Sequence, residues 1–518
     1  MTCAAVLATA ACSASPAVVA PPDGRPSLVV LLAIDQLSAE LLARYAEVYD
    51  GGLRRVLDEG LSFENATHDH AVTVTAVGHT TLGTGVYPAR HGIVGNEWVE
   101  RDGDGWREVY SMSDPDAPIL EHPELEGMGP RNILRPGLAD WVLAQDPNAR
   151  AVSIAKKERS AIGLMAQARG SVYWIPEQVA GFVTSRAYAV FYPEWVQRFN
   201  RDQMPRLYGD TIWGTIVPDS LAPLSRPDSS RWEFDRTHTT FPHRARDHVD
   251  MSNPLELNEW RWDSTPYPDR AVVSFVIEAL RALDLGQRGS VDYLGIGLSQ
   301  TDRIGHTFGP GSREQLDNLL RLDAELDRLF DALDREVGEG RWVMALSADH
   351  GVLEIPEHLA ETGVPAGRIT AAERRALIER VAYAAPGGEW AIREAVRSLP
   401  FVAGAYTFEE VERLPPVDSF AVFVANSHSR TRITSTTARA GVYVRYQPNH
   451  INSGLVTTHG SPYFYDRHVP LLFMGAGIAA GLSSERVATV DVAPTLARFA
   501  GVPFPNDLDG RPIPSVRR

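Results

Sequence analysis

The sequence predicts an α/β fold: a doubly wound, mostly parallel sheet with cap segments inserted between its elements. Two observations support this fold class. Continuous apolar runs rich in β-branched residues are typical of strands that are buried on both faces. Segments with helical periodicity lie between these runs, and strands that alternate with helices are typical of doubly wound sheets.

The first predicted strand, 27–34, is an unbroken apolar run that ends at Asp35. Similar runs lie at 151–155, 292–298, 342–346 and 469–474. The clearest helix is 312–337, where Ser312 caps the start and leucines recur at helical spacing. Gln315 stands three positions after Ser312, which predicts a capping box.

Aspartates follow three of the five predicted strands: Asp35, Asp302 and Asp349. An aspartate after a strand is often only a helix cap or a turn former, so each one alone favours a structural role. Ligands of doubly wound sheets bind at the carboxyl ends of the strands. The three aspartates together therefore indicate a functional site at that edge.

Two stretches interrupt the alternation of strands and helices. Residues 162–288 hold six of the 11 tryptophans and are interpreted as an insertion over the site. A second insertion is placed at 354–446. The expectation is one catalytic domain, 23–518, that contains both insertions.

Residues 1–22 carry no charged side chain and are rich in small and apolar residues. This composition is typical of a signal peptide, although its basic start is lacking. The expected localisation is periplasmic or secreted, and a lipoprotein attached through Cys12 is one alternative. A leader without an export function is the other. Cys3 and Cys12 are the only cysteines, so cleavage would leave no thiol for metal binding.

The overall composition excludes several classes of protein. With 518 residues, 44% hydrophobic and 22% charged, the chain is neither disordered, collagen-like nor a disulfide scaffold. The net charge of −16 and the lack of a basic run argue against binding of duplex nucleic acid. No segment reaches the roughly 18 unbroken apolar residues that a membrane span needs. Only two of the 50 basic residues are lysines, and they are adjacent: Lys156 and Lys157.

Carboxylates and imidazoles with metal-like spacing appear at three places. Asp302 and His306 are four residues apart and would face the same way on a helix. Asp349-His350 follows the predicted strand 342–346, and His459 lies in a turn-like segment. Such ligands without thiolate suit Zn²⁺, or a harder ion such as Mn²⁺. Thr75 opens a helix, where it is either a plain cap or a hydroxyl presented to an anion.

Six short segments occur in a characteristic order: 35–36, 75–80, 87–96, 302–306, 347–351 and 458–462. Together they resemble the alkaline phosphatase superfamily. The resemblance is to the branch that uses a threonine nucleophile, which holds the phosphate-irrepressible alkaline phosphatases and the nucleotide pyrophosphatase/phosphodiesterases.

The resemblance implies two Zn²⁺ ions and a phosphothreonine intermediate on Thr75. One ion would be bound by Asp302, His306 and His459. The other would be bound by Asp35, Asp349, His350 and the Thr75 oxygen. Two such ions can hold the attacking and leaving oxygens of an in-line displacement.

Lys157 and Arg159 follow the predicted strand 151–155. If the chain stays extended, their side chains share a face and reach one phosphoryl group, while Lys156 points away. The resemblance assigns this pair, with Asn96, to the non-bridging oxygens in monoesterases; the diesterases lack the pair. A monoester carries one more charged oxygen than a diester, so extra cations favour it. A solvated surface pair is the alternative interpretation, which the scarcity of lysine argues against.

The expected function is that of an exported zinc-dependent phosphomonoesterase, an alkaline phosphatase of broad specificity for small phosphorylated substrates. A phosphodiesterase or nucleotide pyrophosphatase on the same metal site is the first alternative. A catalytically inactive binding protein, a mutase and a sulfatase are the others. A monomer is favoured.

Overall fold

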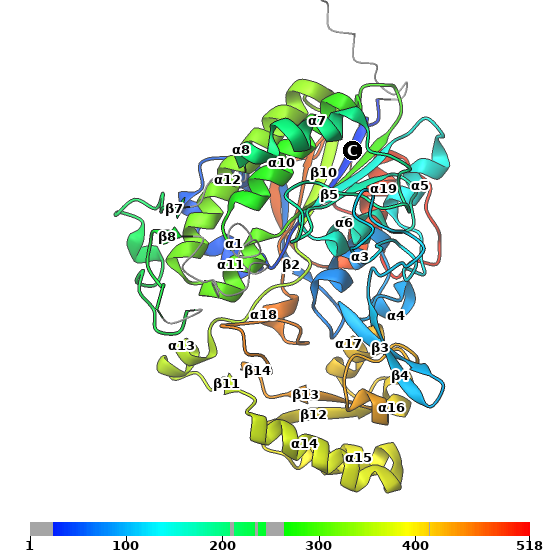
Figure 1. Ribbon diagram of the computed structural model, residues 1–518, viewed down its shortest axis with the longest axis vertical. Helices are drawn as coiled ribbons and strands as arrows, with labels where there is room; N and C mark the ends of the chain where they lie inside the picture. The colour runs from blue at the N-terminus through cyan, green and yellow to red at the C-terminus, as the bar shows by residue number, and fades with distance from the viewer. Residues whose placement is uncertain (1–23, 208–211, 234–236, 245–263, 414, 518) are drawn as a thin grey trace, which may run out of the picture.

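The computed structural model describes residues 24–207, 212–233, 237–244, 264–413 and 415–517 (Figure 1). The predicted leader and both cysteines lie outside these ranges. Within them, eight strands form the central sheet. Their spatial order is β16 (Gly481–Ala488), β2 (Leu61–Thr67), β15 (Leu471–Gly475), β10 (Trp342–Ser347), β1 (Leu28–Ile34), β9 (Asp292–Leu298), β5 (Ala151–Ala155) and β6 (Ser171–Tyr173).

Helices cover both faces of this sheet. Successive side chains of β1 point to opposite faces, and the side chains on both faces are apolar and buried. Leu28, Val30 and Leu32 belong to one apolar cluster, and Val29 and Leu31 belong to the other. The first cluster includes α10 (Tyr267–Ala282), α11 (Gln300–Phe308) and α12 (Arg313–Leu333). The second includes α3 (Thr75–Thr84), α5 (Leu138–Gln145), α6 (Glu158–Met165) and α19 (Val492–Ala500). Figure 1 shows the two sets of helices on opposite sides of the strands. The predicted doubly wound α/β fold is confirmed.

One strand direction differs from the prediction. The run 469–474 was expected to be parallel, but β15 is antiparallel to both β10 and β2. The chain enters β15 soon after the loop that carries His459, at the edge where β10 ends. It must therefore run back through the sheet in the opposite direction.

The predicted helix 312–337 corresponds to α12 and a following π-helical turn, Asp334–Gly338. The Ser312 hydroxyl accepts a hydrogen bond from the Gln315 N–H at 3.0 Å, as expected of a cap. The second half of the predicted capping box is wrong. The Gln315 side chain donates to the Thr301 carbonyl at 2.8 Å instead, which ties α12 to α11.

The central strands end level with one another. In the register of β1, Ile34 lies opposite Leu298 of β9, and Ala33 lies opposite Ser347 of β10. The last residue of β5, Ala155, lies opposite Gly297 of β9. The segments that follow four parallel strands therefore meet at one edge of the sheet, where such folds bind ligands.

The first predicted insertion, 162–288, includes two elements of the layered core. β6 pairs with β5 in the main sheet, and α10 packs in the helical layer with α12. Between them lie α7 (Glu194–Asp202), α8 (Met204–Leu207), β7 (Ile212–Trp213) and β8 (His243–Arg244). Trp260 and Trp262 lie outside the described residues, whereas Trp174 and Trp213 are buried.

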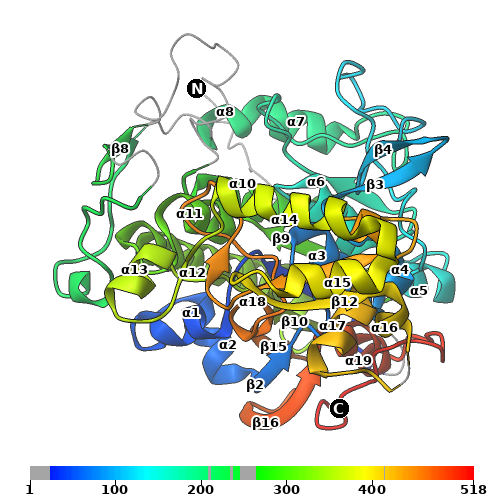
Figure 2. The ribbon, with the colours of Figure 1, turned by 90° about the horizontal axis from the view of Figure 1, so that it is seen from below.

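The second predicted insertion, 354–446, contains a small lobe with an apolar core of its own, which the sequence did not indicate. This core is built from α14 (Ala371–Ala384), α15 (Gly388–Arg397), β12 (Val402–Thr407) and β13 (Val442–Tyr446). The lobe lies at the bottom of Figure 1 and faces the viewer in Figure 2. Smaller elements around it are α13 (Pro356–Glu361), β11 (Gly367–Arg368), α16 (Phe408–Glu412), α17 (Ser419–Ser427) and β14 (His450–Ile451).

Two of the remaining elements, α1 (Ala39–Arg44) and α2 (Gly52–Glu59), contribute residues to the first apolar cluster. The others are α4 (Pro88–His91), α18 (Phe464–Arg467) and a hairpin of β3 (Glu97–Asp102) and β4 (Gly105–Tyr110). None of the helices in the described ranges combines the length and apolar character that crossing a bilayer requires.

Candidate metal centre

Two groups of carboxylate and imidazole side chains meet at the carboxyl edge of the sheet. The potential ligand atoms within each group all lie within 4.8 Å of one another. The first group is Asp302, His306 and His459, and the second is Asp35, Asp349 and His350. The structure thus brings together, in the expected two sets, all six of the predicted carboxylate and histidine ligands.

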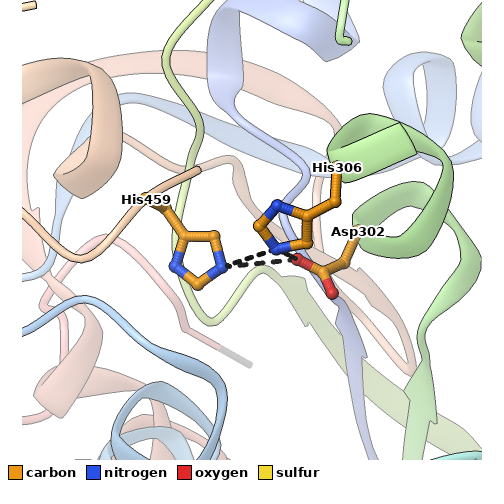
Figure 3. Close-up of side chains that lie close together, drawn as sticks. All are labelled: Asp302, His306 and His459. Atoms are coloured by element: carbon orange, nitrogen blue, oxygen red, sulfur yellow. Dashed lines mark hydrogen bonds and ion pairs between the residues drawn. The ribbon is translucent and has the colours of Figure 1, made fainter. Parts of the chain in front are cut away.

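The first group combines helix α11 with a distant loop. The His306 Nε2 atom lies 3.1 Å from Oδ1 of Asp302, one helical turn earlier, as the four-residue spacing predicts. The Nε2 atom of His459 lies 3.4 Å from the same oxygen. Figure 3 shows both imidazoles turned toward this carboxylate.

The tautomers of both imidazoles follow from their backbone contacts. Nδ1 of His306 donates to the Thr457 carbonyl at 2.8 Å, and Nδ1 of His459 donates to the Thr73 carbonyl at 2.7 Å. In the neutral form that a metal ligand requires, each Nε2 then carries a lone pair, and these two atoms lie only 3.2 Å apart. Two lone pairs that face each other beside a carboxylate repel, and a shared cation would remove the repulsion.

The second group is fully buried. Asp35 follows β1, and Asp349 and His350 follow β10. The His350 Nε2 atom lies 3.5 Å from Asp35 Oδ1 and 3.3 Å from Asp349 Oδ2. These three atoms have no hydrogen-bond partner among the described residues. Since buried polar atoms are almost always satisfied, this cluster has the chemistry of a cation site.

The protonation states agree with ligand roles. Burial, with smaller effects from other groups, lowers the pKa of His350 well below its usual range and keeps the imidazole neutral. Burial opposes ionisation of Asp349 and Asp302, but the nearby histidines outweigh it and lower both pKa values. Burial and the other two carboxylates raise the pKa of Asp35. A positive charge near Asp35 is therefore favoured, because it would stabilise the ionised carboxylate.

Lys157 lies between the two groups. Its Nζ atom is 2.6 Å from Oδ2 of Asp35 and 2.6 Å from Oδ2 of Asp302. Burial disfavours the charge on Lys157, but Asp302 and Asp35 outweigh burial and raise its pKa. The side chain is thus a buried ammonium that contacts one carboxylate of each group.

The lysine pair is buried, which excludes the alternative interpretation, but two expectations about its geometry are wrong. Lys156 and Lys157 are 5% and 6% exposed, so neither is a solvated surface residue. The chain does not stay extended, because Lys157 caps α6 and Arg159 lies in its first turn. The argument from alternating strand residues therefore fails. Nevertheless Lys156, Lys157 and Arg159 all line one cavity of about 340 Å³, so Lys156 does not point away from it.

Thr75 is the first residue of α3, and the first turn of this helix packs directly against the second group. The His79 Nδ1 atom lies 2.9 Å from the Thr75 carbonyl oxygen and 3.2 Å from Asp349 Oδ2. Gly78 allows the approach, because a β-carbon there would lie 2.1 Å from the Asp349 carbonyl oxygen. The buried Thr75 is therefore held at a helix N-terminus beside this group.

Asn96 is oriented by the same helix end. Its Oδ1 atom accepts the N–H of Ala76, the residue after Thr75, at 2.9 Å. With its oxygen fixed on the helix, the side-chain amide keeps its two N–H groups for another acceptor.

Gln36 is a residue that the sequence indicated only as part of a motif. Its backbone N–H donates to Asp349 Oδ1 at 3.1 Å, and its side-chain amide donates to Asp302 Oδ1 at 2.7 Å. Gln36 therefore links the two groups. It also approaches Gly305 so closely that a β-carbon there would clash with the Gln36 amide oxygen at 1.9 Å.

Asp466 was not indicated by any sequence signal. Its carboxylate accepts the backbone N–H and the hydroxyl of Ser461 at 2.8 and 2.6 Å, and its backbone carbonyl accepts the N–H of Gly351 at 2.8 Å. It thus joins the loop of His459 to the turn that carries His350. Burial raises its pKa to about 8.

The chain resembles known proteins over most of its length. It matches the family described as type I phosphodiesterase / nucleotide pyrophosphatase over residues 29–398. Alkaline phosphatase PhoV of Synechococcus elongatus is 30% identical, over 94% of this chain and 92% of its own. Alkaline phosphatase PafA of Elizabethkingia meningoseptica is 29% identical, over 95% and 94%. A protein of Myroides odoratus named calcium-transporting ATPase is 30% identical, over 94% of each chain.

The fold comparison agrees with the sequence comparison. The crystal structure of wild-type PafA has a TM-score of 0.85 at 28% identity, and the match covers 95% of this chain and 99% of that one. The chain therefore belongs to the type I phosphodiesterase / nucleotide pyrophosphatase family, within the alkaline phosphatase superfamily.

Proposed function

We propose that the protein is a metal-dependent phosphomonoesterase, an alkaline phosphatase of broad specificity for small phosphate monoesters. The observation that carries the proposal is the position of Lys157. Its ammonium contacts a carboxylate of each candidate metal group, and Arg159 lines the same cavity. Two cations beside a metal centre suit the dianion of a monoester better than the single charge of a diester.

The relatives support this choice. PhoV and PafA are both named alkaline phosphatases. One solved PafA variant carries substitutions of a threonine, an asparagine, a lysine and an arginine. The spacing from threonine to asparagine and from lysine to arginine equals that of Thr75 to Asn96 and Lys157 to Arg159.

The proposed cofactor is a pair of Zn²⁺ ions. Asp302, His306 and His459 would hold one ion. Asp35, Asp349, His350 and the Thr75 oxygen would hold the other. When bound, the two ions would supply positive charge to the reacting oxygens and lower the pKa of a coordinated hydroxyl. Neutral imidazoles and buried carboxylate oxygens without partners are the ligands that this role requires.

The side chains divide the reaction between them. The Thr75 oxygen would attack phosphorus in line as the bond to the ester oxygen breaks, so that the alcohol leaves and phosphothreonine forms. Water would then release phosphate and restore the threonine. Asn96, Lys157 and Arg159 would donate to the non-bridging oxygens, where negative charge is concentrated in the transition state.

The deciding experiment compares kcat/KM for an aryl phosphate with that for its methyl diester. A strong preference for the monoester supports the proposal, whereas a preference for the diester would identify a phosphodiesterase. ATP is a useful third substrate, given the name of the Myroides relative. Metal analysis of the purified protein tests the inactive binding protein, which would hold fewer than about two zinc ions per chain.

Export through residues 1–22 is part of the proposal. The mass of the protein recovered from its producing cells separates the outcomes. A mature chain that begins after about residue 22 supports cleavage by signal peptidase. A lipid mass on Cys12 would establish a lipoprotein, and an intact leader would contradict export.

A further inference from the structure

We infer that Tyr110 and Glu158 are positioning residues that hold the Arg159 guanidinium at the phosphoryl site and thereby set the preference for monoesters over diesters. The phosphoryl site is the place where Asn96, Lys157 and Arg159 would bind the non-bridging oxygens. The inference rests on the proposed function and extends it to residues that make no contact with the candidate metal ligands. Tyr110 and Glu158 line the same cavity as Lys157 and Arg159.

The donor and the acceptor can be assigned in each hydrogen bond among Tyr110, Glu158 and Arg159. The Tyr110 hydroxyl donates its single proton to Oε1 of Glu158. Its lone pairs then accept from Nη1 of Arg159 at 3.3 Å, and the same Nη1 reaches Oε1 of Glu158 at 3.4 Å. Both hydrogen bonds described for the guanidinium go to this pair. The buried Nε of Arg159 has no partner among the described residues.

Charge keeps the three groups together. The side chains of Arg159 and Glu158 are only 23% and 17% exposed. Burial opposes the charge on Glu158, but Arg159 and Tyr110 outweigh it and lower the pKa of that carboxyl. An ion pair with so little solvent around it is held in one geometry, because separating its members would leave a charge poorly solvated.

The β3–β4 hairpin connects this pair to Asn96, another residue that would donate to the phosphoryl group. It starts directly after Asn96, and Tyr110 at its end pairs with Glu97. The N–H of Ser111 donates to the Asn96 carbonyl at 2.9 Å and closes the hairpin. One element therefore fixes Asn96, which is bound to the start of α3, and Tyr110, which is bound to Arg159.

This arrangement explains how Tyr110 would affect selectivity. A guanidinium binds two oxygens in a fixed planar geometry, so its contribution depends on its orientation. A monoester offers a charged oxygen at the place where a diester carries its second substituent. A loosely held Arg159 would therefore weaken the transition state of the monoester far more than that of the diester.

The test uses Tyr110→Phe, which keeps the ring and its packing and removes the hydroxyl. The kcat/KM for the aryl monoester should fall about tenfold to a hundredfold, as for a lost hydrogen bond to a charged group. The kcat/KM for the diester should change by less than about twofold. Inhibition by inorganic phosphate should weaken in parallel with the monoester rate. Equal losses on both substrates would overturn the inference.

Tyr192→Phe is the matched control. Tyr192 is a buried tyrosine, and its hydroxyl, like that of the half-buried Tyr110, makes a hydrogen bond: it donates to the Leu120 carbonyl at 3.0 Å. Losing this hydrogen bond should leave the ratio of monoester to diester activity unchanged. A change of that ratio as large as in Tyr110→Phe would show that any buried hydroxyl has the effect, and would overturn the inference.

A double-mutant cycle tests whether Tyr110 acts through Arg159. On an Arg159→Ala background, Tyr110→Phe should cause no further loss of monoester activity. Additive losses would overturn the inference. Glu158→Gln removes the charge but retains an acceptor, and it should lower the monoester to diester ratio in the same direction. Failure of the proposed function is distinct, because it would appear in the wild-type protein as a preference for the diester.

Discussion

Gly78 on α3 and Asp349 after β10 are in direct backbone contact. A β-carbon on Gly78 would lie 2.1 Å from the Asp349 carbonyl oxygen and 2.6 Å from its α-carbon. Because the colliding atoms are backbone, neither can rotate away. The absence of a side chain at Gly78 thus determines how closely Thr75, three residues earlier, approaches the second candidate metal group.

Replacing Gly78 with alanine should displace Asp349 or the first turn of α3. We expect Gly78→Ala to lose hydrolytic activity and bound metal, and to be destabilised by about 2–4 kcal/mol. Metal analysis and thermal unfolding measure both effects. Gly214→Ala is the control, because a β-carbon there meets no atom within 4 Å. A fully active, metal-loaded Gly78→Ala protein would show that the contact is not needed.

Thr75→Ala should abolish turnover and leave the fold and the metal content largely intact, because a carboxylate–imidazole set remains around each site. Thr75→Ser should retain part of the activity, since it keeps a hydroxyl at the helix N-terminus. Rapid acid quenching followed by mass spectrometry should find phosphate on Thr75 in the wild-type protein. Substantial turnover by Thr75→Ala would instead mean that water attacks the substrate directly.

Lys157→Ala should lower kcat/KM for the monoester by about a hundredfold or more, and for the diester much less. The reason is that the Lys157 ammonium, in its proposed role, would donate to the oxygen that only the monoester leaves charged. Lys156→Ala is the neighbouring control, and any effect it has should be similar for both substrates. Equal losses on both substrates for Lys157→Ala would remove the argument for a monoesterase.

The parts of the site that the sequence predicts are those encoded over short distances. A buried parallel strand needs a continuous apolar run, so the position of Asp35 after β1 can be predicted. The spacing of Asp302 and His306 is likewise a property of one helical turn. These local patterns are sufficient for the fold class, whereas the division of the ligands into two groups comes from the family resemblance that the order of the motifs carries.

Other features depend on contacts between distant segments, and no local pattern encodes them. The direction of β15 follows from the edge at which the chain re-enters the sheet. The hydrogen bonds of Gln36 to Asp302 and of Tyr110 to Glu158 join residues that are far apart in the sequence. The position of Arg159 was predicted from strand geometry, but the turn into α6 at Lys157 made that premise wrong.

Removal of the metal should abolish activity and lower the melting temperature. Without a cation, Asp35 Oδ1, Asp349 Oδ2 and His350 Nε2 remain buried without hydrogen bonds, so bound metal stabilises the folded state. Dialysis against a chelator, followed by calorimetry and assays with added Zn²⁺ or Mn²⁺, measures both effects. Zn²⁺ should restore more activity than Mn²⁺. A chelated protein with unchanged activity and melting temperature would contradict a metal centre.

Asp466 should make stability depend on pH. Its buried carboxyl has a pKa raised to about 8, far above the value near 4 of an unfolded aspartate. The folded state therefore holds a proton that the unfolded state releases, and the contribution of this group to stability falls as the pH rises from about 4 to about 8. Above that range the contribution stays constant.

Asp466→Asn keeps an oxygen that accepts from Ser461 but cannot ionise. The unfolding free energy of the wild type, relative to that of the variant, should fall by up to a few kcal/mol as the pH rises from about 5 to about 8.5. Urea unfolding of both proteins across this range measures it, with Asp219→Asn as a control at an exposed aspartate. Parallel curves for wild type and Asp466→Asn would mean that Asp466 is already ionised at pH 5. In that case the hydrogen bonds from Ser461 outweigh burial, and the loop of His459 is held by a charged carboxylate throughout.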